Sequence, residues 1–109
     1  MLRLVLKGVW FDMIDSGVKL EEYRVIKDYW ILRLCKVVKP YCRDFSNTLP
    51  KDYDLKDFKE VEFKHGYQKN GRKMVFKIES ISIGEGRTEW GAEKGKKYFV
   101  IKLGKRCTQ

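Results

Sequence analysis

SGVKLEEYR, at Ser16–Arg24, is the stretch that decides the expected fold of this chain. Gly17 can adopt the left-handed conformation that ends a helix, and a strand is expected from Lys19 onward. Side chains alternate along a strand, so Glu22 and Arg24 share one face. Lys19 joins that face only if it lies in the turn before regular pleating begins. A strand used only for packing would carry valine or isoleucine here. The charges therefore predict a small polar site, and a solvated strand with one ion pair is the alternative.

The sequence on either side of this stretch predicts the first elements of the fold. Upstream, weak alternation predicts a strand over Leu2–Leu6, and helical spacing predicts a short helix over Val9–Ser16. The charged strand extends over Lys19–Val25. Pro40 is expected to end the helix that follows this strand. The apolar stripe of that helix comprises Ile26, Tyr29, Trp30, Leu34, Val37 and Val38.

The region from Pro40 to about Lys59 is polar and has no convincing period, so it is expected to be a long surface excursion. One helical turn could form around Leu55–Phe58. Excursions of this length inside small domains are usually functional, but nothing in the sequence assigns this one a role.

The second half of the chain is expected to be β-structure. Asn70-Gly71 predicts a hairpin between a strand around Val61–Phe63 and the next strand. Apolar alternation over Met74–Ile83 changes phase near Glu79-Ser80, where a bulge would restore it. Tyr98–Leu103 is apolar at nearly every position, which predicts a central strand covered on both faces.

The order of these elements predicts an α+β fold. Five or six short strands with turn glycines suit a small barrel, with two or three flanking helices. The length of 109 residues is enough for one domain, here 1–109, with the excursion at about 40–59 on its surface. We expect a monomer.

The charge and the cysteines narrow the function classes. The net charge is +9, from 24 basic and 15 acidic residues, which favours polyanions such as RNA, although solubility alone is the alternative reading. No apolar run reaches the length of a membrane helix and no signal peptide is evident, so we expect a cytoplasmic protein. Cys35, Cys42 and Cys107 are expected to be reduced thiols. His65 is the single histidine, so neither a metal site nor a protease-like triad is expected. No cofactor is expected.

Basic and aromatic residues interleave in a way that suits unpaired nucleic acid. Cationic side chains can contact phosphate while aromatic faces stack on bases. Trp10 and Trp30 could instead be core residues. The candidate contacts drawn from these runs are Lys7, Trp10, Arg33 and Tyr67, with Tyr29, Trp30, Lys69 and Arg72 beside them.

The loop Gly84–Lys96 adds two candidate ligand contacts, Glu89 and Trp90. Its glycines allow close backbone approach to a ligand. The alternative is that Trp90 simply plugs one end of the barrel. The loop has neither a dinucleotide fingerprint nor a phosphate-binding loop.

Gly17–Arg24 resembles the G-x-K-x-x-E-x-R pattern of the ASCH domain, a relative of the PUA domain. Leu6–Ser16 resembles the opening of that family. Glu89–Ala92 and Tyr98–Gly104 resemble its close, in the form seen in phage and bacterial members. The resemblance covers nearly the whole chain outside the excursion. It implies a PUA-like β-barrel with a cleft lined by the motif.

The resemblance also implies RNA or a nucleotide-like molecule as the ligand. If the chain is an enzyme, the motif residues Lys19, Glu22 and Arg24 are the candidate catalytic residues, with Lys19 as base and Arg24 holding an oxyanion. One branch of the family hydrolyses acetylated cytidine with the motif lysine, a threonine and a later glutamate, and another has been described as a ribonuclease. The threonine position is Glu22 here, and Glu89 is a candidate for the later glutamate. The residues leave open whether the chain is an RNA-binding module, a hydrolase of a modified nucleoside, a ribonuclease, or a phage protein that docks on a host protein.

Overall fold

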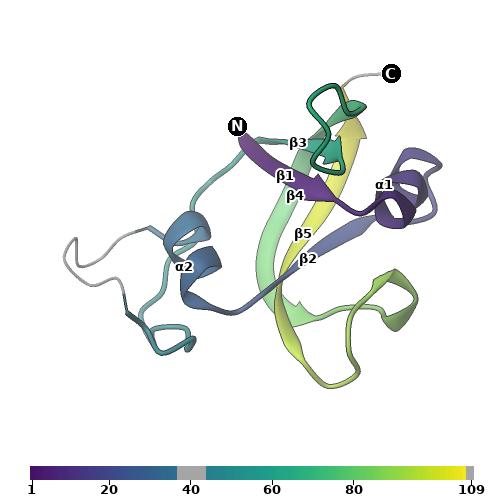
Figure 1. The fold of residues 1–109 in the computed structure, drawn as a ribbon. Coiled ribbons are helices and arrows are strands. Elements are labelled where there is room, and N and C mark those ends of the chain that lie inside the picture. The colour runs from purple at the N-terminus through teal and green to yellow at the C-terminus, as the bar shows by residue number, and fades with distance from the viewer. Residues whose placement is uncertain (37–43, 108–109) are drawn as a thin grey trace. The chain divides into compact units, whose positions relative to one another are not determined.

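The computed structural model describes residues 1–36 and 44–107 and shows an α+β fold. Within these residues there are five strands, two α-helices and one 3₁₀ turn, η1 (Figure 1). The strand order in the sheet is β1-β3-β4-β5-β2. In chain order the elements are β1 (Leu2–Leu6), α1 (Gly8–Asp15), β2 (Glu21–Val25), α2 (Asp28–Leu34), β3 (Glu60–His65), β4 (Lys73–Glu85), η1 (Thr88–Trp90) and β5 (Lys97–Arg106).

The chain forms two compact units. The first unit comprises Met1–Glu22, Phe58–Ser80 and the C-terminal segment from Ile101. The second unit comprises Tyr23–Asp57 and Ile81–Val100. β2, β4 and β5 contribute residues to both units. No helix in the described residues is long and apolar enough to cross a membrane.

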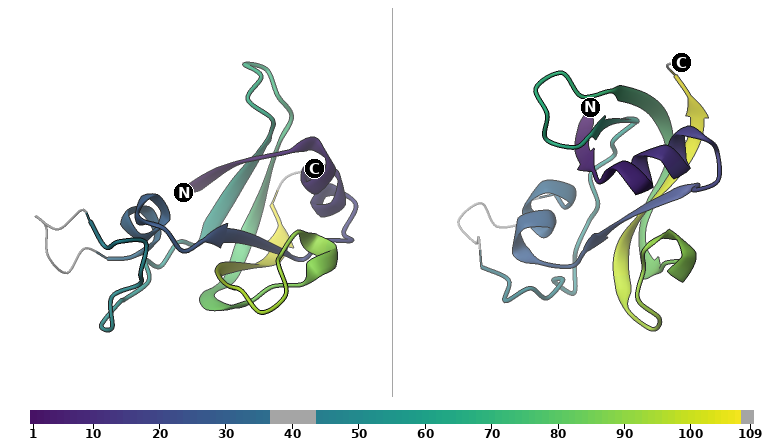
Figure 2. Two further views of the ribbon diagram at one scale, coloured as in Figure 1. Left: turned by 60° about the horizontal axis from the view of Figure 1, so that its bottom comes forward. Right: turned by 45° about the vertical axis from the view of Figure 1, so that its right-hand side comes forward.

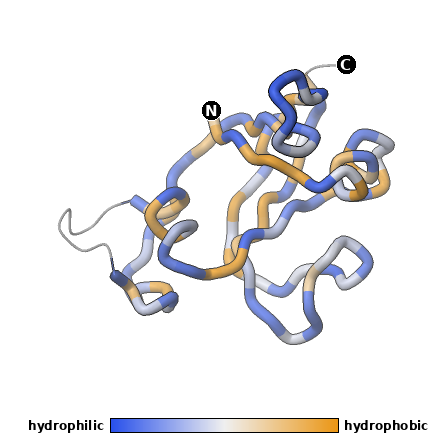
Figure 3. Tube along the Cα trace, viewed as in Figure 1, coloured by the Kyte–Doolittle hydropathy of each residue, from blue (hydrophilic) through white to orange (hydrophobic). Residues whose placement is uncertain are grey.

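The first unit is built on β1, β3 and β4. β1 pairs in parallel with β3, and β3 forms an antiparallel hairpin with β4 (Figures 1 and 2). One side chain in two points inward on each strand, as the sequence alternation predicts. The tube in Figure 3 is hydrophobic along most of β1 and mostly hydrophilic in the loop between β3 and β4. The core residues contributed by these strands are Leu2, Leu4, Leu6, Val61, Phe63, Met74 and Phe76.

Helix α1 lies against β3 in this unit. Phe11 and Ile14, three residues apart, are its buried side chains. The ring of Phe11 meets the ring of His65 edge-on, at 5.1 Å between centroids. Gly8 allows the start of α1 to lie this close to His65, because a Cβ at Gly8 would lie 2.9 Å from His65 Nε2. His65 therefore packs against α1 in this unit.

The second unit contains α2 and the described part of the excursion. The expected helical stripe is wrong in part, because the buried residues of α2 are Ile31 and Leu34 while Tyr29 is exposed. α2 ends at Leu34, so Pro40 does not end it, and Val37, Val38 and Pro40 lie outside the described residues.

The helical turn expected around Leu55–Phe58 is also wrong. Leu55 pairs with Cys35 in an isolated antiparallel bridge. The Lys56 N–H donates to the Leu34 carbonyl at 2.8 Å, and the Lys36 N–H donates to the Asp54 carbonyl at 2.7 Å. The backbone groups of this segment thus bond to the end of α2 and not to one another.

The remaining strands agree well with the sequence. β4 is one strand in which exposure changes phase at Glu79 and Ser80, both exposed. β5 lies inside the strand order between β4 and β2, and Tyr98–Ile101 are four consecutive buried residues. The α+β class and the five strands are confirmed.

Candidate functional site

The end of helix α1 determines where the motif lysine lies. Gly17 has φ +81°, and its N–H donates to the Ile14 carbonyl at 3.0 Å. The Val18 N–H donates to the Met13 carbonyl at 2.9 Å, and these two bonds define a Schellman motif. The Lys19 N–H also bonds to that carbonyl. Lys19 therefore lies in the turn before β2, the position that allows it to meet Glu22.

Lys19 and Glu22 form a buried ion pair. The distance from Lys19 Nζ to Glu22 Oε1 is 2.6 Å, and their side chains are 0% and 6% exposed. The ammonium also donates to the Glu21 carbonyl and lies 5.9 Å from the ring of Trp10. A buried ammonium is tolerated only where such partners compensate its lost hydration. The structure thus brings these two motif residues together in the first unit.

Arg24 belongs to the second unit. Its guanidinium lies 5.1 Å from the centroid of the Trp30 ring, and it donates to the Tyr23 carbonyl at 2.9 Å. Lys19 and Glu22 are placed in one unit and Arg24 in the other. The expectation that all three line one cleft, with the Trp90 loop at its rim, stays a prediction.

Arg24 is one end of a row of cations and rings that we call the arginine–aromatic cluster: Arg24, Trp30, Tyr29 and Arg33. Trp30 and Tyr29 meet edge to face, with 4.8 Å between centroids and 87° between planes. Arg33, on the exposed side of α2, lies 4.3 Å over the Tyr29 ring. Tyr29 is 51% exposed. The cluster therefore presents alternating positive and aromatic faces, two of them at the surface.

The sequence contains a pattern that indicates this cluster, although the predicted apolar stripe of the second helix placed Tyr29 in the core. Tyr29 and Arg33 are four residues apart, so their side chains are neighbours on one face of a helix. An arginine over an aromatic face is a favourable pair. That spacing favours Tyr29 at the surface, where an arginine can reach it.

The other candidate residues differ in exposure. Lys7, at the start of α1, is exposed, and Tyr67, between β3 and β4, is 89% exposed. Trp10 is half-buried. In η1, Glu89 is exposed while Trp90 is buried, with the Arg87 guanidinium 5.0 Å from its ring.

Two tyrosines hold the ends of the loop that carries Trp90. The Arg87 N–H donates to the Tyr23 hydroxyl at 3.0 Å, and the Glu93 N–H donates to the Tyr98 hydroxyl at 2.9 Å. Gly86 lies so close to Tyr23 that a Cβ there would be 2.6 Å from its ring. This packing fixes the loop and buries Trp90.

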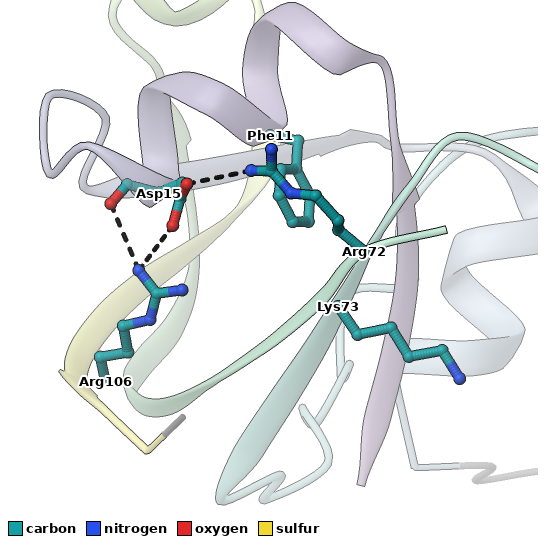
Figure 4. A pocket seen from close by; sticks show the side chains of 5 residues that line it. All are labelled: Phe11, Asp15, Arg72, Lys73 and Arg106. Atoms are coloured by element: carbon teal, nitrogen blue, oxygen red, sulfur yellow. Dashed lines mark hydrogen bonds and ion pairs between the residues drawn. The ribbon is translucent and has the colours of Figure 1, made fainter. Parts of the chain in front are cut away.

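A pocket of about 350 Å³ lies in the first unit, and we call it the basic pocket. Arg72, at the end of the β3–β4 loop, and Arg106, at the end of β5, converge on the carboxylate of Asp15 (Figure 4). Sequence reasoning missed this site, because its parts are far apart in the chain and only folding brings them together. The pocket is lined by Phe11, Asp15, Arg72, Lys73 and Arg106.

Comparison with protein-family models, with curated proteins and with solved structures finds no match for this chain. Among the residues that the structure describes, no three His, Cys, Asp or Glu side chains gather in a way that could hold a metal ion. Cys35 is buried, and burial raises the pKa of its thiol, whereas Cys107 is exposed. Cys42 lies outside the described residues.

Proposed function

We propose that this chain is an RNA-binding domain of the ASCH type, with a PUA-like barrel and unpaired RNA as its ligand. The observation that carries the proposal is the arginine–aromatic cluster of the second unit. It combines the Tyr29 ring, which is 51% exposed, with the exposed guanidinium of Arg33, which lies 4.3 Å over that ring. Unpaired bases stack on such faces, and phosphates pair with such cations.

Two further features support this proposal. The net charge of +9 attracts a polyanion at long range, whatever its sequence. The G-x-K-x-x-E-x-R pattern at Gly17–Arg24 is the family's motif, and its lysine and glutamate are paired at 2.6 Å. Binding is expected to be weak and without strong sequence preference, because the cluster offers stacking faces and cations more than groups that read base edges.

A hydrolase of a modified nucleoside is the second candidate, and the same ion pair disfavours it. A general base must be unprotonated and within reach of its substrate. Lys19 is instead fully buried, and its side-chain nitrogen bonds to the Glu22 carboxylate and the Glu21 carbonyl, so it is not presented to a substrate. We therefore place the cluster, and not Lys19, at the centre of the proposed function.

The test is the affinity of the purified chain for a labelled single-stranded oligouridine, measured by fluorescence anisotropy. Loss of one stacked base costs about 1–3 kcal/mol, so Tyr29→Ala is expected to weaken binding by about tenfold or more. Tyr53→Ala is the matched control, because Tyr53 is an exposed tyrosine of the same unit outside the cluster. Equal affinities of the two variants would contradict the proposal.

A further inference from the structure

We propose that the basic pocket binds the phosphate group of a nucleotide. The ligand class rests on the proposed function, but the pocket lies wholly in the first unit and shares no residue with the arginine–aromatic cluster. The two sites can therefore succeed or fail separately.

The charges of the pocket favour an anion. Its lining carries three cations, Arg72, Lys73 and Arg106, against the single carboxylate of Asp15. Asp12, 3.7 Å from Arg72, offsets one more positive charge. An excess of positive charge remains in a small concave space. Guanidinium groups match the geometry of phosphate oxygens, since their donors form a planar fork.

Asp15 holds the guanidinium groups of Arg72 and Arg106 in position. Arg106 donates to Asp15 Oδ1 at 2.7 Å, and Arg72 donates to Asp15 Oδ2 at 3.0 Å. The two arginines thus point at one carboxylate, which occupies the place where an incoming anion would be held. Arg106 also donates to the Asp15 carbonyl oxygen at 3.3 Å. Asp15 acts as an internal substitute for phosphate: it aligns the arginines and competes with the ligand.

Arg72 also offers a surface for the base. The centre of its guanidinium lies 5.0 Å from the ring of Phe11, which is buried beneath it. The Arg72 side chain is 62% exposed, although its guanidinium also contacts Asp15 and Asp12. Bases stack on guanidinium planes as they do on rings. A base placed there would complete a stack of Phe11, Arg72 and base.

The size of the pocket and its surroundings fit a nucleotide. A volume of about 350 Å³ is at the small end of ligand sites, large enough for one nucleotide and too small for a folded polymer. The segment Lys64–Lys73 that leads to it carries Lys64, Lys69, Arg72 and Lys73 and no acidic residue. Tyr67, 89% exposed, lies in that same segment and can stack on a neighbouring base.

The experiment is a calorimetric titration of the full chain with uridine monophosphate, with uridine and with inorganic phosphate as comparisons. We expect uridine monophosphate to bind more tightly than phosphate, and uridine not to bind measurably. Oligouridines with and without a terminal phosphate distinguish a free nucleotide from the end of an RNA strand. Tighter binding of the phosphorylated strand assigns the pocket to RNA ends, and equal binding of the two strands assigns it to free nucleotides.

Three variants test the geometry. Arg72→Lys keeps the charge but removes the fork and the stack, and should weaken binding of uridine monophosphate about tenfold. Arg3→Lys is the matched control, an exposed arginine of the same unit paired with Glu62. Asp15→Asn removes the competing carboxylate and should strengthen binding by about threefold. Thermal melting of each variant verifies that it is folded.

The outcomes are decisive for the pocket. The inference is overturned if uridine monophosphate binds no better than uridine, if Arg72→Lys behaves like Arg3→Lys, or if Asp15→Asn binds no more tightly than the wild type. If oligouridine still binds in a way that depends on Tyr29, the proposed function survives that failure. If oligouridine does not bind but uridine monophosphate binds through Arg72, the pocket survives and the RNA-binding proposal fails.

Discussion

Neutralising Glu22 should destabilise the protein far more than neutralising an exposed partner of a lysine. In Glu22→Gln the ammonium of Lys19 stays buried, and the carboxylate 2.6 Å away is lost. Removing one partner of a buried ion pair costs about 3–5 kcal/mol, because the buried charge loses its counter-charge. For a domain of this size, about 3 kcal/mol lowers the melting temperature by roughly 10 °C or more.

The matched control is Glu79→Gln. Glu79 Oε1 lies 3.5 Å from Lys102 Nζ, and these side chains are 57% and 52% exposed. An exposed pair contributes at most about 1 kcal/mol, so this variant should unfold close to the wild type. A third variant, Lys19→Met with Glu22→Leu, replaces the pair by apolar side chains. It should recover most of the loss, since no buried charge remains.

The assay is urea unfolding followed by circular dichroism and by tryptophan fluorescence. Because the chain forms two compact units, the two probes must give coincident transitions before a single free energy of unfolding is used. If Glu22→Gln costs no more than Glu79→Gln, Lys19 is hydrated in solution. The motif would then be open to ligand, and the argument that its lysine is withheld from catalysis would be refuted.

Two further predictions concern pH and catalysis. Lys77 donates to Glu60 at 2.7 Å, which lowers the pKa of Glu60 below its ordinary 4.5 and raises the pKa of Lys77 above its ordinary 10.5. The contribution of Glu60 to stability is therefore present above pH 4.5 and is lost as the pH falls through the lowered pKa. The contribution of Lys77 is fully present below pH 10.5 and is lost as the pH rises through the raised pKa. The stability gap between wild type and Glu60→Gln, measured by urea unfolding, should close in acid, and a gap that persists there would contradict this assignment. Acetylated cytidine should be hydrolysed weakly or not at all, because Lys19 is paired with Glu22; turnover detected by chromatography and abolished by Lys19→Ala would show that Lys19 acts as a base despite its partner.

The elements that the sequence predicted best are those whose signal is local. Alternation alone identified β1 at Leu2–Leu6 and the buried Val61 and Phe63 of β3. Gly17 marked the end of α1, because few other residues adopt its φ of +81°. The condition that Lys19 must lie in the turn followed from strand periodicity, and the bonds to Met13 satisfy it.

The features that the sequence did not predict depend on contacts between distant residues. Tyr29 and Trp30 are consecutive, and periodicity could not tell which apolar face of α2 is buried; the buried residues are Ile31 and Leu34. The segment Leu55–Phe58 has helical propensity in isolation, but its backbone pairs with the end of α2. The basic pocket joins α1, the start of β4 and the end of β5, whose register no local pattern reveals.

The most direct test of the central claim, that this domain binds unpaired RNA through cations and stacked rings, is the salt dependence of its affinity for single-stranded oligouridine. Each phosphate contact contributes about −0.7 to the slope of log K against log salt for a single strand. We predict binding at low salt with a clearly negative slope, which becomes about 0.7 less steep in Arg33→Ala. Absence of binding at low salt, or an affinity that does not change with salt, would contradict the account.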